Sequence, residues 1–121
     1  MTPPKLNTYN TKVSNQWGTP PNLYAQLNQE FQFNCDPCPL VQSPEIDGLT
    51  IPWGTRTFIN PPYDSIEPWA KKCREEQLRG NLCVLLIPSR TSTKYFHKWV
   101  LPHAEIRFIE GRLKFLNQSG L

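Results

Sequence analysis

Four consecutive residues, Asn60, Pro61, Pro62 and Tyr63, combine the groups that chemistry at an aromatic amino group requires. The nitrogen of such a group is a weak nucleophile, and acceptors for its N–H groups stabilise the positive charge that develops during attack. The Asn60 side-chain oxygen and the Pro61 carbonyl can accept these hydrogen bonds, and the two prolines hold the turn rigid. The Tyr63 ring offers a stacking surface for a base flipped out of its duplex. These four residues are the candidate catalytic residues; the alternative is a proline turn with a packed tyrosine.

The candidate catalytic residues follow a short apolar run, Thr57–Asn60, which predicts a strand. A second predicted strand, Phe31–Asp36, ends where prolines begin. In open α/β sheets, ligands bind beyond the carboxyl ends of the strands. We therefore expect the site near Asp36 and Asn60.

The remaining elements follow from hydrophobic periodicity and capping residues. We expect helices from Thr19-Pro20 to about Gln29, over Ile66–Arg79 and over Thr93–Val100. Further strands are expected over Leu82–Ile87, over Glu105–Ile109 and from Arg112 to Phe115, with a structured loop at 37–56. The continuously apolar run Leu82–Ile87 is typical of a central strand covered on both faces. Strands that alternate with helices predict an α/β fold with a mostly parallel sheet flanked by helices.

The length of 121 residues has room for one small domain, expected over 17–121 after an irregular arm at 1–16. No apolar stretch approaches the roughly 18 residues that a membrane span needs, and the N-terminus lacks the apolar region of a signal peptide. The sequence therefore predicts a soluble intracellular protein with no membrane partner.

Four cysteines raise the question of a metal site. Cys35 and Cys38 have the spacing of half a zinc site, but Cys73 falls in a predicted helix and Cys83 in a predicted strand. The two histidines, at 97 and 103, are poorly spaced as ligands. We predict reduced cysteines and no metal.

The charge is concentrated towards the C-terminus. Residues 86–121 carry six Lys or Arg against two Glu, whereas residues 1–85 carry seven basic and eight acidic residues. A basic C-terminal third suits a polyanionic partner, although an ordinary solvated surface is an equal alternative.

Together, these segments resemble a known family, the phage-type Dam family of DNA N6-adenine methyltransferases. The strand followed by Asn-Pro-Pro-Tyr resembles the signature of S-adenosylmethionine-dependent amino-methyltransferases. The other matching segments cover most of residues 17–115 in the family's order: Trp17–Pro20, Phe33–Asp36, Asp47–Leu49 with Trp53, Thr57–Tyr63, Ile87–Thr91 with Phe96, and Glu110–Phe115.

The resemblance implies a minimal Rossmann-like methyltransferase fold that lacks some standard strands, with S-adenosylmethionine as the cofactor. It implies that Trp17, Thr19 and Pro20 lie against the methionine end of the cofactor, where the start of a helix suits a carboxylate. The alternative is a simple helix cap, with Thr19 as the N-cap and a buried Trp17. Asp36 would approach the ammonium or the ribose, although a turn-capping role is an equal alternative. The remaining cofactor-binding candidates are Asp47, Phe58 and Asn60.

The resemblance also implies that the substrate is double-stranded DNA containing adenine. Residues after the predicted Leu82–Ile87 strand would lie near the flipped base or its phosphates, although Arg90 is nearly as well explained by a structural salt bridge. The nucleic-acid-binding candidates are Ser89, Arg90, Thr91, Lys94, Arg112 and Lys114. Such an enzyme is expected in the cytoplasm of a bacterial cell, with a phage or prophage origin.

Two departures from the pattern leave alternatives open. The usual Gly-rich turn is replaced by Asp36-Pro37-Cys38-Pro39, and the family's chain continues beyond Phe115 for another strand or hairpin. We therefore expect either a naturally short member or a fragment, in which a homodimer could cover the missing edge. One alternative function is a degenerate methyltransferase fold that binds nucleic acid or a partner. Others are methylation of RNA adenine or of a glutamine amide.

Overall fold

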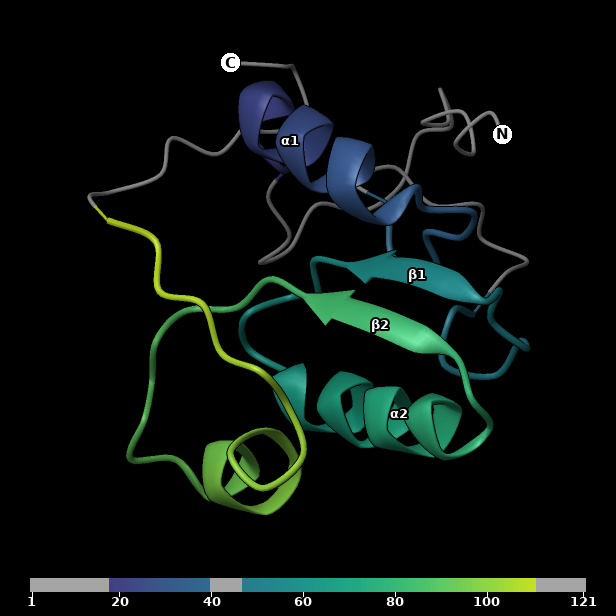
Figure 1. The fold of residues 1–121 in the computed structure, drawn as a ribbon. Helices are drawn as coiled ribbons and strands as arrows, with labels where there is room; N and C mark the ends of the chain where they lie inside the picture. The colour runs from purple at the N-terminus through teal and green to yellow at the C-terminus, as the bar shows by residue number, and fades with distance from the viewer. Residues whose placement is uncertain (1–17, 40–46, 111–121) are drawn as a thin grey trace.

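The computed structural model describes residues 18–39 and 47–110 (Figure 1). No helix in these two ranges is both long enough and apolar enough to cross a membrane. The elements follow one another as α1 (Pro21–Phe31), β1 (Arg56–Ile59), α2 (Ile66–Leu78), β2 (Leu82–Leu85) and η1, a π-helical segment (Phe96–Val100). The order confirms an α/β arrangement.

Strands β1 and β2 pair in parallel, with Arg56 opposite Leu82 and Ile59 opposite Leu85. Residues next to Cys35 run along the other edge of β1, where the Cys35 carbonyl accepts a 3.0 Å hydrogen bond from the Phe58 N–H. Three extended segments therefore finish at one edge of the molecule. The parallel direction predicted from the sequence is confirmed for the two described strands.

The expected strand at Phe31–Asp36 is shorter than predicted. Helix α1 continues to Phe31, and the chain leaves it at Gln32, whose φ of 53° is left-handed. The Asn28 side-chain oxygen then accepts a hydrogen bond from the Phe33 N–H at 2.9 Å. Only a single bridge, at Cys35, joins this segment to β1.

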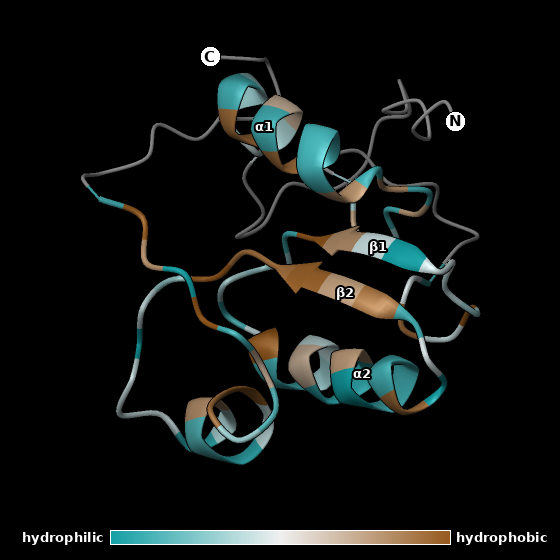
Figure 2. Ribbon diagram, in the orientation of Figure 1, coloured by the Kyte–Doolittle hydropathy of each residue, from teal (hydrophilic) through white to brown (hydrophobic). Residues whose placement is uncertain are grey.

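The two faces of the strand pair are covered by different helices (Figure 1). On one face, Phe33 and Phe58 pack against the apolar side of α1. On the other, Ile59 packs with Trp53 and with Trp69 of α2. Figure 2 shows hydrophobic residues along β2 and in the second half of β1, whereas β1 begins with a hydrophilic residue.

Helix α2 confirms the prediction for Ile66–Arg79 to within one residue. It ends before Gly80, whose φ of 90° suits glycine. Near its end, the fully buried Glu76 carboxylate accepts a hydrogen bond from the Asn81 side chain at 2.8 Å and lies 3.5 Å from the Lys72 ammonium. These contacts anchor the turn that leads into β2.

Three predictions about the second half are corrected or refined. Strand β2 covers Leu82–Leu85 and, in the described part of the chain, pairs only with β1, so among these residues it lies at an edge of the sheet. The Thr93–Val100 region is helical as predicted, but Phe96–Val100 has the winding of a π-helix, η1. Residues 105–109 form no strand, because Arg107 is held by Glu30 of α1 through two 2.8 Å contacts and Phe108 is 74% exposed. The strand predicted from Arg112 lies outside the described residues.

Candidate functional site

The Asn-Pro-Pro-Tyr turn directly follows β1, the more buried of the two described strands. Thr57, Phe58 and Ile59 are all buried, and Asn60 is only 5% exposed. The Pro62 carbonyl accepts a 3.1 Å hydrogen bond from the Ser65 N–H, which closes the turn at the start of α2. A buried strand on one side and a helix on the other therefore fix the turn, as a preorganised site requires.

The Asn60 side chain contacts the segment that precedes α1. Its Nδ2 donates a hydrogen bond to Thr19 Oγ1 at 3.1 Å. Thr19 was expected to cap the helix, but the capping position is occupied by Pro20 and no side-chain cap hydrogen bond forms. The structure thus brings together two residues that the sequence placed in separate motifs.

Tyr63 lies partly buried beyond the turn. Burial raises the pKa of its hydroxyl to about 12, against a smaller opposing effect of Arg90. The phenol therefore stays protonated near neutral pH, so its ring and its O–H group, and not a phenolate, are what it offers a ligand.

Arg90 links the loop after β2 to the Asn-Pro-Pro-Tyr turn. Its Nη1 donates a hydrogen bond to the Tyr63 carbonyl at 3.2 Å. The loop itself is held by a 2.8 Å hydrogen bond from the Thr93 hydroxyl to the Arg90 carbonyl and by a 2.7 Å contact between His97 Nε2 and the Thr91 carbonyl. Both loops at the carboxyl ends of β1 and β2 are therefore joined.

Asp36 follows the third extended segment and is partly buried. Its Oδ1 accepts a hydrogen bond from the Cys38 N–H at 3.1 Å. Burial raises the pKa of Asp36 to about 7, and the Cys38 N–H opposes this rise. Burial raises the pKa of Tyr24, and the charge of Asp36 adds to this rise. A buried carboxylate of this kind favours a cationic ligand group.

Asp47 lies in a turn beside the Asp36 segment. Its carboxylate accepts a 3.0 Å hydrogen bond from the Leu49 N–H. The neighbouring Gly48 is buried so tightly that a Cβ there would collide with the Pro37 carbonyl. The Gly48 carbonyl also accepts a 2.8 Å hydrogen bond from the Trp53 indole. This glycine holds the Asp47 turn against the Asp36 loop.

Two other cofactor-binding candidates are placed differently. Phe58 is 1% exposed, and its ring meets that of Tyr24 edge-on with 5.1 Å between centroids, so it supports the site from the core. Trp17 lies outside the described residues.

The candidate nucleic-acid residues are only partly described. Ser89, Arg90, Thr91 and Lys94 are exposed on the loop that follows β2. Arg112 and Lys114 lie outside the described residues. These four exposed residues therefore lie at the same edge of the sheet as the Asn-Pro-Pro-Tyr turn, beyond the carboxyl ends of β2 and β1.

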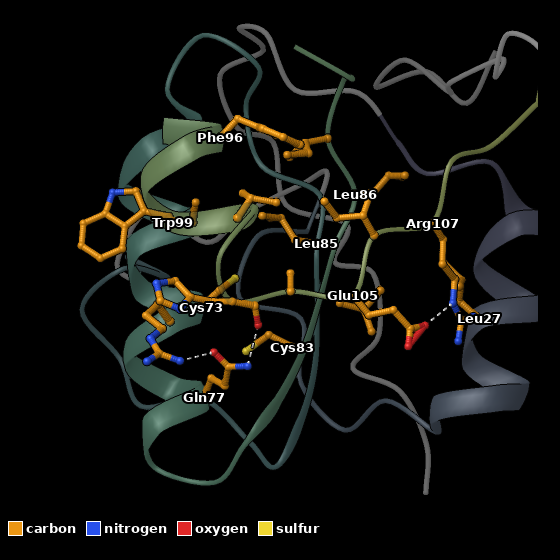
Figure 3. Close-up of a pocket in the computed structure, with 18 of the residues that line it drawn as sticks. Leu27, Cys73, Gln77, Cys83, Leu85, Leu86, Phe96, Trp99, Glu105 and Arg107 are labelled. Atoms are coloured by element: carbon orange, nitrogen blue, oxygen red, sulfur yellow. Dashed lines mark hydrogen bonds and ion pairs between the residues drawn. The ribbon is translucent and has the colours of Figure 1, made fainter. Parts of the chain in front are cut away.

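A cleft of about 690 Å³ runs along the side of β2 away from β1 (Figure 3). Helix α1 contributes Leu27, η1 contributes Trp99, and the extended residues 104–109 form the outer wall. Tyr63 and Ser89 both line it, so the hollow reaches the loops of the candidate site.

Among the described residues, no group of three or more His, Cys, Asp or Glu side chains is placed to hold a metal ion. Cys38 is buried in the core beside Trp53. A hydrogen bond with the Cys83 thiol, together with burial, raises the pKa of Cys73 and keeps its thiol neutral. These cysteines pack as apolar side chains.

The sequence did not identify Tyr24 and Asn34 as part of this region. Tyr24 packs in the same apolar cluster as Leu27 and Phe31, and its pKa is raised by burial and, to a smaller extent, by the charge of Asp36. Asn34 Oδ1 accepts a 3.0 Å hydrogen bond from the Arg56 N–H and thus ties the Asp36 segment to the start of β1. No local signal distinguishes an asparagine with that role.

The sequence matches a family of known proteins. The family described as DNA N-6-adenine-methyltransferase (Dam) matches residues 7–120. A DNA N-6-adenine-methyltransferase of Escherichia phage T1 is 29% identical over 112 residues, which cover 84% of this chain and 47% of the phage protein. The chain thus spans about half the length of that curated relative. No solved structure matches significantly. Because the family match extends over nearly the whole sequence, the chain belongs to the Dam family of DNA N-6-adenine-methyltransferases.

Proposed function

We propose that this protein transfers a methyl group from S-adenosylmethionine to the exocyclic nitrogen of a flipped adenine in double-stranded DNA. The observation that carries the proposal is the buried Asn60 at the end of β1, held in a closed turn and bonded to Thr19. Family membership supports DNA adenine as the acceptor.

In this proposal, Asn60 and the Pro61 carbonyl accept hydrogen bonds from the adenine amino group. These acceptors stabilise positive charge on the nitrogen as it attacks, so no base has to remove a proton beforehand. Tyr63 stacks on the base, and its protonated hydroxyl is consistent with that role. The cleft that Tyr63 and Ser89 line provides space beside the turn for the base.

The described residues fit the cofactor. When bound, S-adenosylmethionine supplies an electrophilic methyl group on a sulfonium centre. Asp36 is a partly buried carboxyl group at the carboxyl end of an extended segment and suits the ammonium or ribose of the cofactor. The N–H groups of Asn22 and Leu23 in the first turn of α1 suit its carboxylate, since prolines occupy the two preceding positions. Asp47 lies in the adjoining turn and is the candidate for the adenosine.

We propose that the exposed Arg90, Thr91 and Lys94 contact DNA phosphates next to the cleft. Ser89 lines the cleft itself and would approach the base. We further propose that the protein acts in the bacterial cytoplasm, and that it forms a homodimer in which a second copy covers the side of β2 that pairs with no strand among the described residues.

The direct test incubates the full chain with radiolabelled S-adenosylmethionine and an adenine-containing duplex, followed by nucleoside analysis. The proposal expects label in N6-methyladenine. An RNA duplex and a glutamine-containing peptide serve as competing acceptors, and preferential labelling of either would contradict it. DNA binding with no incorporation into any acceptor would favour a binding module that retains the fold.

A further inference from the structure

Thr19 and Asn60 are joined in a way that the sequence alone does not reveal. The hydrogen bond from Asn60 Nδ2 to Thr19 Oγ1 spans 3.1 Å and connects the segment before α1 to the turn after β1. Each of the two residues is followed by a pair of prolines, Pro20-Pro21 and Pro61-Pro62. A residue before proline is restricted to extended backbone conformations, so both ends of this hydrogen bond are held in place.

The Thr19 hydroxyl is directed to the asparagine and not to its own helix. A threonine just before a helix commonly bonds a backbone N–H of the first turn. Here α1 begins with Pro20 at the capping position, and its cap makes no side-chain hydrogen bond. Thr19 lies one residue before this capping position, and its hydroxyl faces Asn60 at the end of β1.

The chemistry of a carboxamide makes this contact important. An asparagine nitrogen only donates hydrogen bonds and its oxygen only accepts them. The terminal torsion of asparagine is broad, so packing alone selects its orientation weakly. A threonine hydroxyl can accept a hydrogen bond or donate one, and in the structure it accepts from the Asn60 nitrogen, which directs the carboxamide oxygen to the opposite side of the amide group.

We propose that Thr19 is a positioning residue, whose hydroxyl sets the rotation of the Asn60 carboxamide so that its oxygen faces the acceptor amine. This inference rests on the proposed role of Asn60 and deepens it. It differs from the role that the family resemblance implied for Thr19, which was contact with the methionine end of the cofactor.

The test compares two substitutions in the full chain. Thr19→Val keeps the size of the side chain but removes the hydroxyl, and Thr19→Ser keeps the hydroxyl. We expect the valine variant to lose about tenfold or more in kcat, with KM for S-adenosylmethionine changed by less than about threefold, because a transition-state acceptor is misoriented. The serine variant is expected to recover most of that loss. If the valine variant does not fold, Thr19→Ala provides the same comparison.

A second measurement needs no activity. Heteronuclear NMR shows the side-chain amide resonances of Asn60, identified by their absence in Asn60→Ala. We expect Thr19→Val to shift this pair and Thr19→Ser to leave it nearly in place.

Three results would overturn the proposal: an unshifted amide pair in the valine variant, equal kcat losses in both variants, or a loss confined to KM for the cofactor. An inactive wild-type chain whose amide pair still shifts would instead reject the proposed function while keeping the hydrogen bond.

Discussion

Arg90 donates a hydrogen bond from Nη1 to the backbone carbonyl of Tyr63 at 3.2 Å, across the gap between the loops that follow β2 and β1. The sequence left open whether this arginine binds a phosphate or forms a structural salt bridge. The structure shows that its exposed guanidinium contacts the Asn-Pro-Pro-Tyr turn, and the phosphate contact proposed above would use its remaining N–H groups.

Arg90→Ala is expected to loosen the Tyr63 end of the turn. We predict a roughly tenfold lower kcat, because small displacements of positioning groups are costly. Steady-state methylation of a duplex measures kcat. Arg79→Ala is the control, since Arg79 is exposed at the end of α2. An unchanged kcat in the Arg90 variant would show that the contact with Tyr63 has no role in catalysis.

Lys94→Ala is expected to affect DNA binding alone. Lys94 is exposed on the loop after β2, so its loss should remove about one phosphate contact and reduce the slope of log K against log salt by about 1. Fluorescence anisotropy with a labelled duplex at several salt concentrations measures this slope. Lys71→Ala, on the exposed side of α2, should leave it unchanged. Equal slopes for the wild type and the Lys94 variant would exclude a phosphate contact there.

Asp36 is expected to make the unliganded protein less stable as the pH rises. Its pKa of about 7 in the folded chain lies above the ordinary value for aspartate of 3.8, because burial disfavours the carboxylate. The favourable contribution of the protonated form is therefore fully present below about pH 4 and is lost as the pH rises to about 7. Asp36→Asn cannot ionise, so the stability of wild type relative to this variant should fall over that range. Urea unfolding at pH values from about 4 to about 8 measures the difference. A constant or increasing difference would contradict the burial of this carboxyl group.

Gly48→Ala is expected to destabilise the fold by about 2 kcal/mol or more, because the added Cβ meets the Pro37 carbonyl and the Trp69 ring. Gly80→Ala is the matched control. No atom lies near its added Cβ, but its φ of 90° costs an alanine about 1 kcal/mol. Thermal unfolding should rank the Gly48 variant as the less stable of the two. The reverse order would show that the Asp47 turn can move away from the Asp36 loop.

The sequence was most informative where short-range signals agree with long-range packing. The helical spacing of residues 66–79 and the glycine that follows them, Gly80, placed α2 to within one residue. The apolar run before Asn60 identified β1. The four-residue turn was found because its chemistry is contained in consecutive residues.

The sequence was least informative where distant residues compete for a segment. The alternation in Glu105–Ile109 favoured a strand, but Arg107 pairs with Glu30 of α1, a contact between residues 77 positions apart. The apolar run Leu82–Ile87 favoured a central strand, but β2 pairs only with β1 among the described residues. Composition does not reveal how many neighbours a strand has. The Thr19–Asn60 hydrogen bond could not be predicted because it depends on how α1 is placed against β1.

The most direct test of the proposed role of Asn60 is the methyl-transfer rate of Asn60→Ala. The affinity of the same variant for S-adenosylmethionine is measured in parallel by calorimetry. The exposed carboxamide of Gln29 on α1 provides the control substitution, Gln29→Ala. We predict that the Asn60 variant loses at least about a hundredfold in rate, as removal of a transition-state hydrogen-bonding partner does, and keeps nearly wild-type cofactor affinity. A rate within about tenfold of wild type would show that Asn60 does not bind the acceptor amine.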